Sequence, residues 1–178
     1  LLVSVLASVG CILLGSFLAW LVILTDVPGR GLLGSLASLS FVIPSFAVAL
    51  AWQVLFRNDR VGGSVGLFQE LGFAVPDWLA WGFVPVVLSL VTHYYSLSFL
   101  LISAGLASVS ADVLEAAHMT DANRFRILRG ITFPLVLPAI LASAVLTFAS
   151  TVSNFASPAL LGLPVRFETL STRMYGMI

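Results

Sequence analysis

The sixteen charged residues of this chain are confined to its connecting segments, which leaves four long apolar stretches without charge. The stretches cover about residues 1–24, 32–56, 82–109 and 135–156. A helix needs roughly 20 mainly apolar residues to cross the hydrocarbon core of a bilayer, where a charged side chain is costly. Because the stretches are continuous rather than alternating, they favour helices over barrel strands. The sequence therefore predicts an all-α polytopic membrane protein with about four transmembrane helices.

The composition excludes several classes of soluble protein. Of the 178 residues, 60% are hydrophobic and only 9% are charged, against about 25% charged in soluble domains. The formal net charge is zero, whereas a nucleic-acid-binding protein needs a basic excess. The chain contains no Lys, so it is not a P-loop ATPase or a kinase, which place a Lys on the nucleotide phosphates. Because it starts at Leu1 inside an apolar run, we expect it to be a fragment of a longer protein.

The orientation of the stretches does not follow from the arginines. Segments 25–31 and 110–134 together hold four arginines, and segments 57–81 and 157–178 on the opposite side also hold four. The positive-inside rule therefore does not predict an orientation for this chain. Trp78 and Trp81 in the longer loop are typical of a membrane–water interface.

Segment 110–134 carries signals for two short helices between two spans. Asp112 can cap the first helix with Glu115 three residues later, and Asp121 can cap the second. Pro134 then opens the fourth stretch at a position where a missing N–H does no harm. Such a hairpin is too polar for the bilayer and is suited to docking a partner.

This segment resembles the EAA motif of permease subunits of binding-protein-dependent ABC importers. That motif reads E-A-A, three residues, G, nine residues and I-x-L-P. The chain matches the spacing at every position from Glu115 to Pro134, with Asp121 in place of Gly and Phe133 in place of Leu. Asp tolerates turns, so we expect the bend to be kept. The resemblance assigns ATPase coupling to Glu115, Ala116, Ala117, Asp121, Ile131 and Pro134.

Three further segments resemble permeases of the iron(III), thiamine and phosphonate group. Residues 25–30 are similar to T-D-x-P-G-R, residues 153–162 to S-D-F-G-x-P-A-L-L-G, and residues 167–175 to F-x-T-L-T-T-x-I-Y. The resemblance implies that residues 1–178 are part of one type I ABC permease helical bundle. It also implies that 110–134 is a cytoplasmic coupling loop, and that 57–81 and 157–178 face the periplasm.

The function implied by this resemblance is ATP-driven import across the bacterial inner membrane of a solute such as iron(III) or a related small molecule. The implied partners are a cytoplasmic ATP-binding subunit dimer, a periplasmic substrate-binding protein, a second permease half or subunit, and membrane lipid, with no nucleic acid. The chain itself would be non-catalytic and without cofactor or metal, because ATP hydrolysis would occur in the separate ATPase subunit.

Polar residues inside the apolar stretches are candidates for the translocation pathway. They are His93, Tyr94 and Tyr95 in the middle of the third stretch and Asn154 at the end of the fourth. The alternative is that each of them bonds to a neighbouring helix. Helix packing is also the favoured interpretation of the row of small residues Ala139, Ser143, Thr147 and Thr151.

Other interpretations remain open at the level of the sequence. Glu115 can act as a helix cap only, and Arg124, Arg126 and Arg129 can face anionic lipid as well as an ATPase. A secondary transporter or channel not driven by ATP would use titratable groups within the membrane, and only His93 offers one. A membrane enzyme would need a nucleophile–base pair or metal ligands, which two isolated His do not supply. Neither class explains the EAA spacing.

Overall fold

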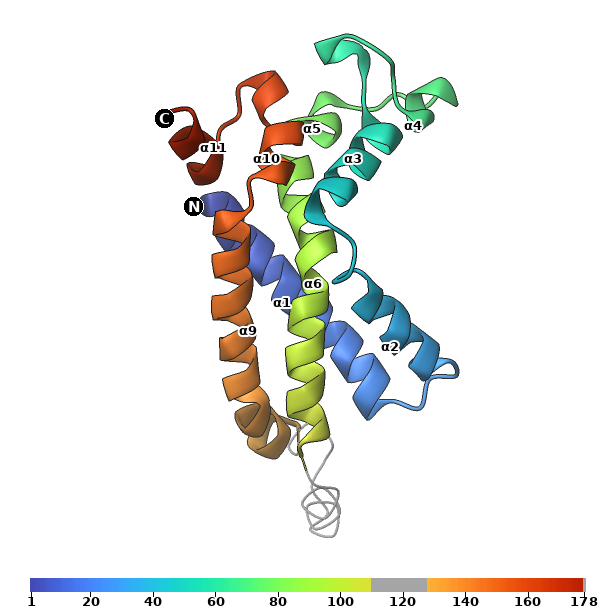
Figure 1. Ribbon diagram of the computed structural model, residues 1–178. Helices are drawn as coiled ribbons and strands as arrows, with labels where there is room; N and C mark the ends of the chain where they lie inside the picture. Colours follow the sequence, from blue (N-terminus) through green and yellow to red (C-terminus); the bar gives the residue numbers. More distant parts are fainter. Residues whose placement is uncertain (110–127, 178) are drawn as a thin grey trace.

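The fold is a bundle built around three long helices (Figure 1). A computed structural model describes residues 1–109 and 128–177. The described elements are α1 (Leu2–Leu24), α2 (Arg30–Leu39), α3 (Ser45–Phe56), η1 (Asp59–Val61), α4 (Leu67–Glu70), α5 (Asp77–Ala80), α6 (Phe83–Ala107), the π-helix η2 (Leu128–Thr132), α9 (Phe133–Ser153), α10 (Ala156–Leu161), η3 (Leu163–Val165) and α11 (Leu170–Tyr175). Within these residues there is no strand. The architecture is that of an all-α polytopic membrane protein, as the sequence predicted.

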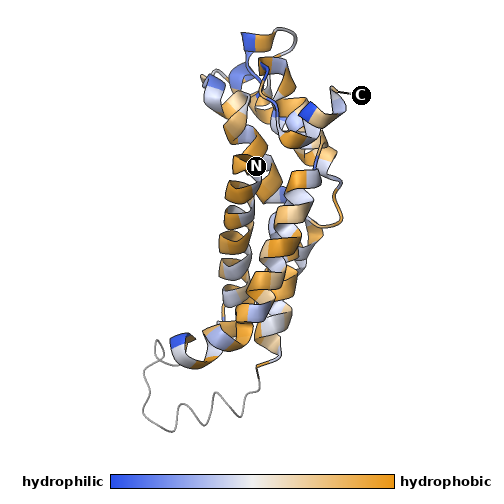
Figure 2. Ribbon diagram, turned by 90° about the vertical axis from the view of Figure 1, so that its left-hand side faces the viewer, coloured by the Kyte–Doolittle hydropathy of each residue, from blue (hydrophilic) through white to orange (hydrophobic). Residues whose placement is uncertain are grey.

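Three described helical segments are long and apolar enough to cross a membrane: Leu2–Leu24, Asp77–Ala107 and Leu128–Ser153. They contain α1, α6 and α9, whose ends lie at most three residues from the ends predicted for the first, third and fourth apolar stretches. Figure 2 shows hydrophobic residues along the shafts of these helices and hydrophilic residues gathered at the two ends of the molecule. Uninterrupted apolar runs of this length are sufficient to specify these three helices.

The prediction of one continuous helix over residues 32–56, the second apolar stretch, is wrong. The chain instead forms α2 and α3, separated by residues 40–44. Pro44 precedes the first residue of α3, has no N–H to donate to the preceding turn, and disfavours helical backbone at Ile43. Ser45–Phe56 is shorter than the three spanning segments. Both α2 and α3 pack against α6, at different heights along it (Figure 1).

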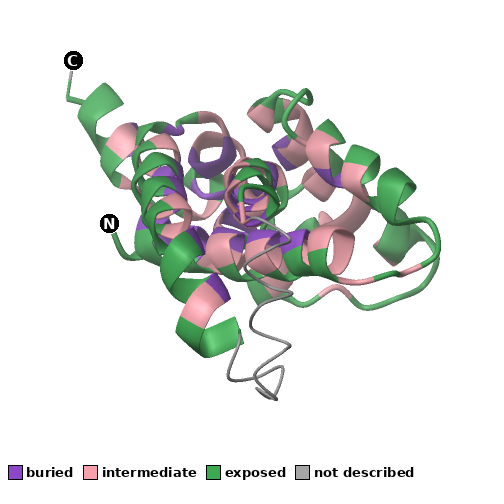
Figure 3. Cartoon of the chain, turned by 90° about the horizontal axis from the view of Figure 1, so that it is seen from below, coloured by how far each residue is buried: buried purple, intermediate pink, exposed green. Residues whose placement is uncertain are grey.

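Small residues bring the long helices into close contact. At Gly15 of α1, an added Cβ would lie 2.7 Å from the backbone nitrogen of Phe99 in α6, and at Gly105 of α6 it would lie 2.7 Å from Cβ of Ala139 in α9. Ser143, Thr147 and Thr151, in the predicted row of small residues, are buried. Seen from one end of the bundle, the buried segments lie on the helix faces that meet, and the exposed ones lie outside (Figure 3). Close approach of helix backbones at small residues is the usual mode of packing in lipid.

Two apolar clusters lie at opposite ends of α6. One joins Val86 and Leu90 of α6 to Val3 and Ala7 of α1 and to Leu161 of α10. The other joins the remaining end of α6 to α1, α2 and α9 through Phe99, Ile102, Leu106, Ala19, Ala37 and Val136. The helix α6 is therefore the central element against which the other helices are positioned.

Candidate functional site

Some of the residues that the EAA motif identifies lie within the described residues, and the others lie outside them. Glu115, Ala116, Ala117 and Asp121 lie outside residues 1–109 and 128–177. Ile131 lies in η2, and Pro134 is the second residue of α9. Pro134 therefore lies in the first turn of α9, directly after the π-helix η2.

The two helices that flank residues 110–127 are packed against each other. Near the C-terminal end of α6, Gly105 allows the contact with Ala139 described above. Val136 of α9 is buried in the same cluster as Ile102 and Leu106 of α6. Thr132 is buried next to the half-buried Ile131, whereas Pro134 is exposed. A displacement applied to either end of this segment would therefore act on α6 and α9 as one unit, because cores this closely packed are stiff.

The polar candidates Tyr94 and Asn154 lie side by side. The Asn154 amide Nδ2 donates to the Tyr94 hydroxyl at 3.1 Å, although the two residues are 60 positions apart. Asn154 Oδ1 accepts the backbone N–H of Ser157 at 3.1 Å, and Ser171 Oγ donates to the Asn154 backbone oxygen at 2.8 Å. Asn154 is only 7% exposed. It therefore joins the end of α9 to α6, α10 and α11 through neutral hydrogen bonds.

His93 and Tyr95 have different surroundings from Tyr94. The ring of His93 lies edge-on to that of Tyr94, with ring centroids 4.5 Å apart, and its Nδ1 is buried without a partner among the described residues. Tyr95 instead accepts a hydrogen bond from Ser40 Oγ at 3.0 Å, at the break between α2 and α3. Successive residues of a helix point about 100° apart, so three adjacent side chains reach three neighbours. Pathway lining by these residues stays a prediction.

These contacts position the helices relative to one another. The hydroxyl and amide groups form hydrogen bonds that join helices to one another, and the imidazole of His93 contacts the ring of Tyr94 on the same helix. In the part of the chain that the structure describes, no group of three or more His, Cys, Asp or Glu side chains could hold a metal ion. Gln53, at the end of the second stretch, is also a link, because its Nε2 donates to the Leu160 oxygen at 2.7 Å.

A polar network between α3 and α5 was not anticipated from the sequence. Asn58 Nδ2 donates to Asp77 Oδ1 at 2.7 Å, and Asn58 Oδ1 accepts the indole N–H of Trp81 at 2.8 Å. Arg60 forms an ion pair with the other oxygen of Asp77 at 2.8 Å. Trp81 is buried, at 5% exposed, whereas Trp78 is 61% exposed, and both lie in the loop segment that the sequence marks as typical of a membrane–water interface. An Asn after an apolar run signals a turn, but its partner 23 residues later does not follow from the sequence.

Comparison with known proteins places this arrangement in a family. The family model described as "Binding-protein-dependent transport system inner membrane component" matches residues 11–178. The putative 2-aminoethylphosphonate transport system permease protein PhnU of Salmonella typhi is 28% identical over 157 residues, covering 86% of this chain and 53% of PhnU. The putative ferric transport system permease protein FbpB 1 of Haemophilus influenzae is 29% identical over 77% of this chain and 21% of its own length.

The molybdenum transport system permease protein ModB of Escherichia coli K12 is 29% identical over 99% of this chain and 76% of ModB. The chain spans about half the length of the PhnU proteins that it matches. The match to the family model includes α6, residues 110–127 and α9, and therefore contains the whole segment that carries the EAA spacing.

Proposed function

Because this chain belongs to the family of binding-protein-dependent transport system inner membrane components, we propose that it is the membrane-spanning part of an ATP-driven importer of a small solute. The observation that carries the proposal is the family match over residues 11–178. The chain is a multi-pass component of the bacterial inner membrane. ATP hydrolysis is assigned to a separate subunit, with this chain as the non-catalytic permease.

Residues 110–134 are proposed as the contact with the ATPase. Glu115, Ala116, Ala117 and the turn at Asp121 would form the contact surface, with Ile131 and Pro134 connecting it to α9. The packing of Gly105 against Ala139 supports this proposal, because it joins the two flanking helices directly beside the segment. Motion of an ATPase dimer would then reach α6 and α9 together.

The proposed topology places segments 25–31 and 110–134 in the cytoplasm and segments 57–81 and 157–178 in the periplasm. The position of the elements supports it, since α4, α5, α10 and α11 gather at one end of the bundle, whereas the C-terminal end of α6 and the N-terminal end of α9 lie at the other (Figure 1). A substrate-binding protein would deliver solute to the first end. A second permease half or subunit would complete the pathway, with His93, Tyr94, Tyr95 and Asn154 as the candidate lining residues.

The proposed cargo is iron(III) or a related small solute. The relatives named for 2-aminoethylphosphonate, ferric and molybdenum transport support a small solute and leave its identity to experiment. The described spanning helices α1, α6 and α9 contain no acidic residue that could hold a bare cation. The specificity is therefore assigned to the binding protein rather than to this chain.

Cysteine crosslinking tests the proposed contact. Ala116→Cys, in the full permease expressed with its ATPase and binding protein, should crosslink to the ATPase with a yield that depends on nucleotide. Ala149→Cys is the matched control, because Ala149 is an exposed residue of α9 far from its N-terminal end. Uptake of iron(III), 2-aminoethylphosphonate and molybdenum is measured in turn. Uptake of the solute that the complex transports should require ATP. Transport without ATP, together with no crosslink in any nucleotide state, would refute the importer assignment and favour a carrier or channel.

A further inference from the structure

The short helix α10 contacts both α3 and α6, at the end of the bundle that carries α4, α5 and α11 (Figure 1). Its residues Ser157, Pro158 and Leu161 are buried. Leu161 belongs to the same apolar cluster as Ala49 of α3 and Val86 of α6. The helix α10 therefore lies where a displacement of α6 would be passed on to α3.

The C-terminal end of α10 is held by two different helices. The last carbonyl groups of a helix have no partner within it and need donors from elsewhere. Gln53 Nε2 of α3 donates to the Leu160 oxygen at 2.7 Å. The backbone N–H of Gly82, directly before α6, donates to the Leu161 oxygen at 2.8 Å. Two neighbouring carbonyl groups of α10 thus connect α3 to the start of α6.

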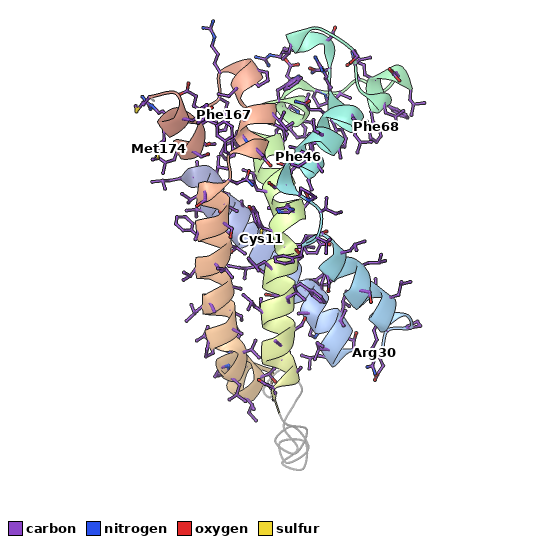
Figure 4. The ribbon with its side chains drawn as sticks, in the orientation of Figure 1. Cys11, Arg30, Phe46, Phe68, Phe167 and Met174 are labelled. Atoms are coloured by element: carbon purple, nitrogen blue, oxygen red, sulfur yellow. The ribbon has the colours of Figure 1, made fainter. Side chains whose placement is uncertain are left out.

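The connection to α6 is made by backbone atoms and is reinforced by packing. Gly82 has a φ of 89°, in the left-handed region that favours glycine. Phe83, the first residue of α6, packs edge-on against Phe167, which is labelled near α10 in Figure 4, with ring centroids 5.9 Å apart. The connection to α3, in contrast, depends on the side chain of Gln53.

The N-terminal end of α10 is attached to α6 and α9. Asn154, directly after α9, accepts the Ser157 backbone N–H at Oδ1 and donates from Nδ2 to the Tyr94 hydroxyl of α6, both at 3.1 Å. Because α6 and α9 also pack together at their other ends, α10 belongs to the same packed unit. The remaining question is what holds α3 to that unit.

Two adjacent side chains attach the last turns of α3. Trp52 Nε1 donates to the Leu79 oxygen of α5 at 2.9 Å, and Gln53 bonds to α10. An amide within an apolar stretch is unfavourable unless it is hydrogen-bonded. The half-buried amide of Gln53 is therefore stable where it lies because α10 offers a carbonyl group without a partner in its own helix.

We propose that Gln53 is a positioning residue of the transport cycle, an inference that rests on the proposed function. By holding α3 against α10, it makes a displacement of α6 and α9 beside residues 110–127 also displace α3 at the opposite end of the bundle. Gln53 acts through the backbone of α10, and no contact with the solute is required for this role.

Distances between spin labels in the complete transporter, with its ATPase and binding protein, test the proposal. The labels are attached to Val54→Cys on α3 and Val145→Cys on α9, at two exposed positions, while buried Cys11 stays unlabelled. With Gln53 intact, we expect one distance that is the same without nucleotide and with ATP trapped by vanadate. Gln53→Leu should add a second distance and raise the proportion of detached α3 about fivefold, the change expected for loss of one neutral hydrogen bond.

Gln69→Leu is the matched control, because it makes the same substitution at a half-buried glutamine whose Oε1 has no partner among the described residues. It should leave the single distance unchanged. Uptake of iron(III), 2-aminoethylphosphonate or molybdenum per ATP hydrolysed gives a second readout. Gln53→Leu should lower this ratio about fivefold, whereas a general loss of folded protein would lower uptake and hydrolysis together.

Two results would overturn the proposal. A label distance that changes with ATP while Gln53 is intact would show that α3 moves independently of α9. A distance distribution that Gln53→Leu leaves unaltered would show that the bond to α10 does not hold α3. Failure of the proposed function would appear separately, as uptake without ATP, and the distances measured without nucleotide would still decide whether Gln53 holds α3.

Discussion

Replacing Gly15 with Ala should separate α1 from α6 and destabilise the bundle. The added Cβ would lie 2.7 Å from both the Phe99 backbone nitrogen and Cβ of Ser98. These atoms belong to, or are fixed directly on, the backbone of α6, so no side-chain rotation relieves the contact. Ordinary contact begins at 3.4 Å, and one helix must therefore shift by about 0.7 Å relative to the other.

The size of the effect follows from two opposing contributions. Forcing one extra methyl group into a tight contact costs about 1–3 kcal/mol. Ala favours a helix over Gly by about 0.8–1 kcal/mol. The net loss for Gly15→Ala is therefore about 1 kcal/mol in the free energy of unfolding. Gly31→Ala is the matched control, because a Cβ at Gly31 meets nothing within 4 Å. The two variants should differ by about 1–3 kcal/mol, which is the packing contribution alone.

Gly10→Ala gives an intermediate case on the same helix. The nearest atom to its added Cβ is Cγ2 of Val91, at 2.7 Å. That atom is the end of a side chain and can move without moving the backbone of α6. We expect a loss of stability smaller than that for Gly15→Ala.

The only cysteine of the chain provides the assay. Cys11 is fully buried in α1, and its Sγ lies 3.8 Å from the Val91 oxygen of α6. A thiol-reactive fluorophore will therefore label Cys11 only when α1 and α6 separate. On heating the purified complex, the labelling midpoint for Gly15→Ala should fall by about 2–4 °C per kcal/mol lost. Equal midpoints for Gly15→Ala and Gly31→Ala would refute the close approach of the two helices.

Three further substitutions are followed by the same thermal assay. Tyr94→Phe removes the acceptor of the Asn154 amide and should lower stability by about 0.5–1.5 kcal/mol; a wild-type midpoint would contradict a role for this bond in holding α9 to α6. Trp81→Phe leaves the buried Oδ1 of Asn58 without its donor and should cost about 1–3 kcal/mol; retention of full stability would count against the buried network. Arg60→Gln removes a half-exposed ion pair and should change stability by about 0–1 kcal/mol, less at high salt; a larger loss that is insensitive to salt would show that the pair is not solvent-screened.

The long helices could be located from the sequence because hydropathy acts over many residues at once. The stretches predicted at 1–24, 82–109 and 135–156 correspond to α1, α6 and α9 with only small differences at the ends. A boundary is set by local capping, whereas the existence of a spanning helix is set by some twenty residues acting together.

The candidate polar residues could be located along the chain but not assigned to partners. Tyr94 and Tyr95 are adjacent and chemically identical, yet one bonds to Asn154 and the other to Ser40. The direction of each side chain follows from helical geometry, but the neighbour that lies in that direction follows from how α2, α6 and α9 pack. That packing depends on glycines such as Gly15, whose role is invisible until the opposing helix is placed.

The break between α2 and α3 shows why proline alone does not predict where a membrane helix ends. Pro138 lies inside α9 without breaking it, whereas Pro44 lies at a break. Pro138 is in the second turn of α9, and the carbonyl that its missing N–H would have bonded belongs to Pro134, which is exposed. Pro44 follows Ser40, whose hydroxyl bonds to Tyr95 of α6 and whose neighbours close α2 with short turns. Both stretches contact α6, but the Ser40–Tyr95 hydrogen bond and the short turns that close α2 occur only in the second stretch, and they stabilise a break there.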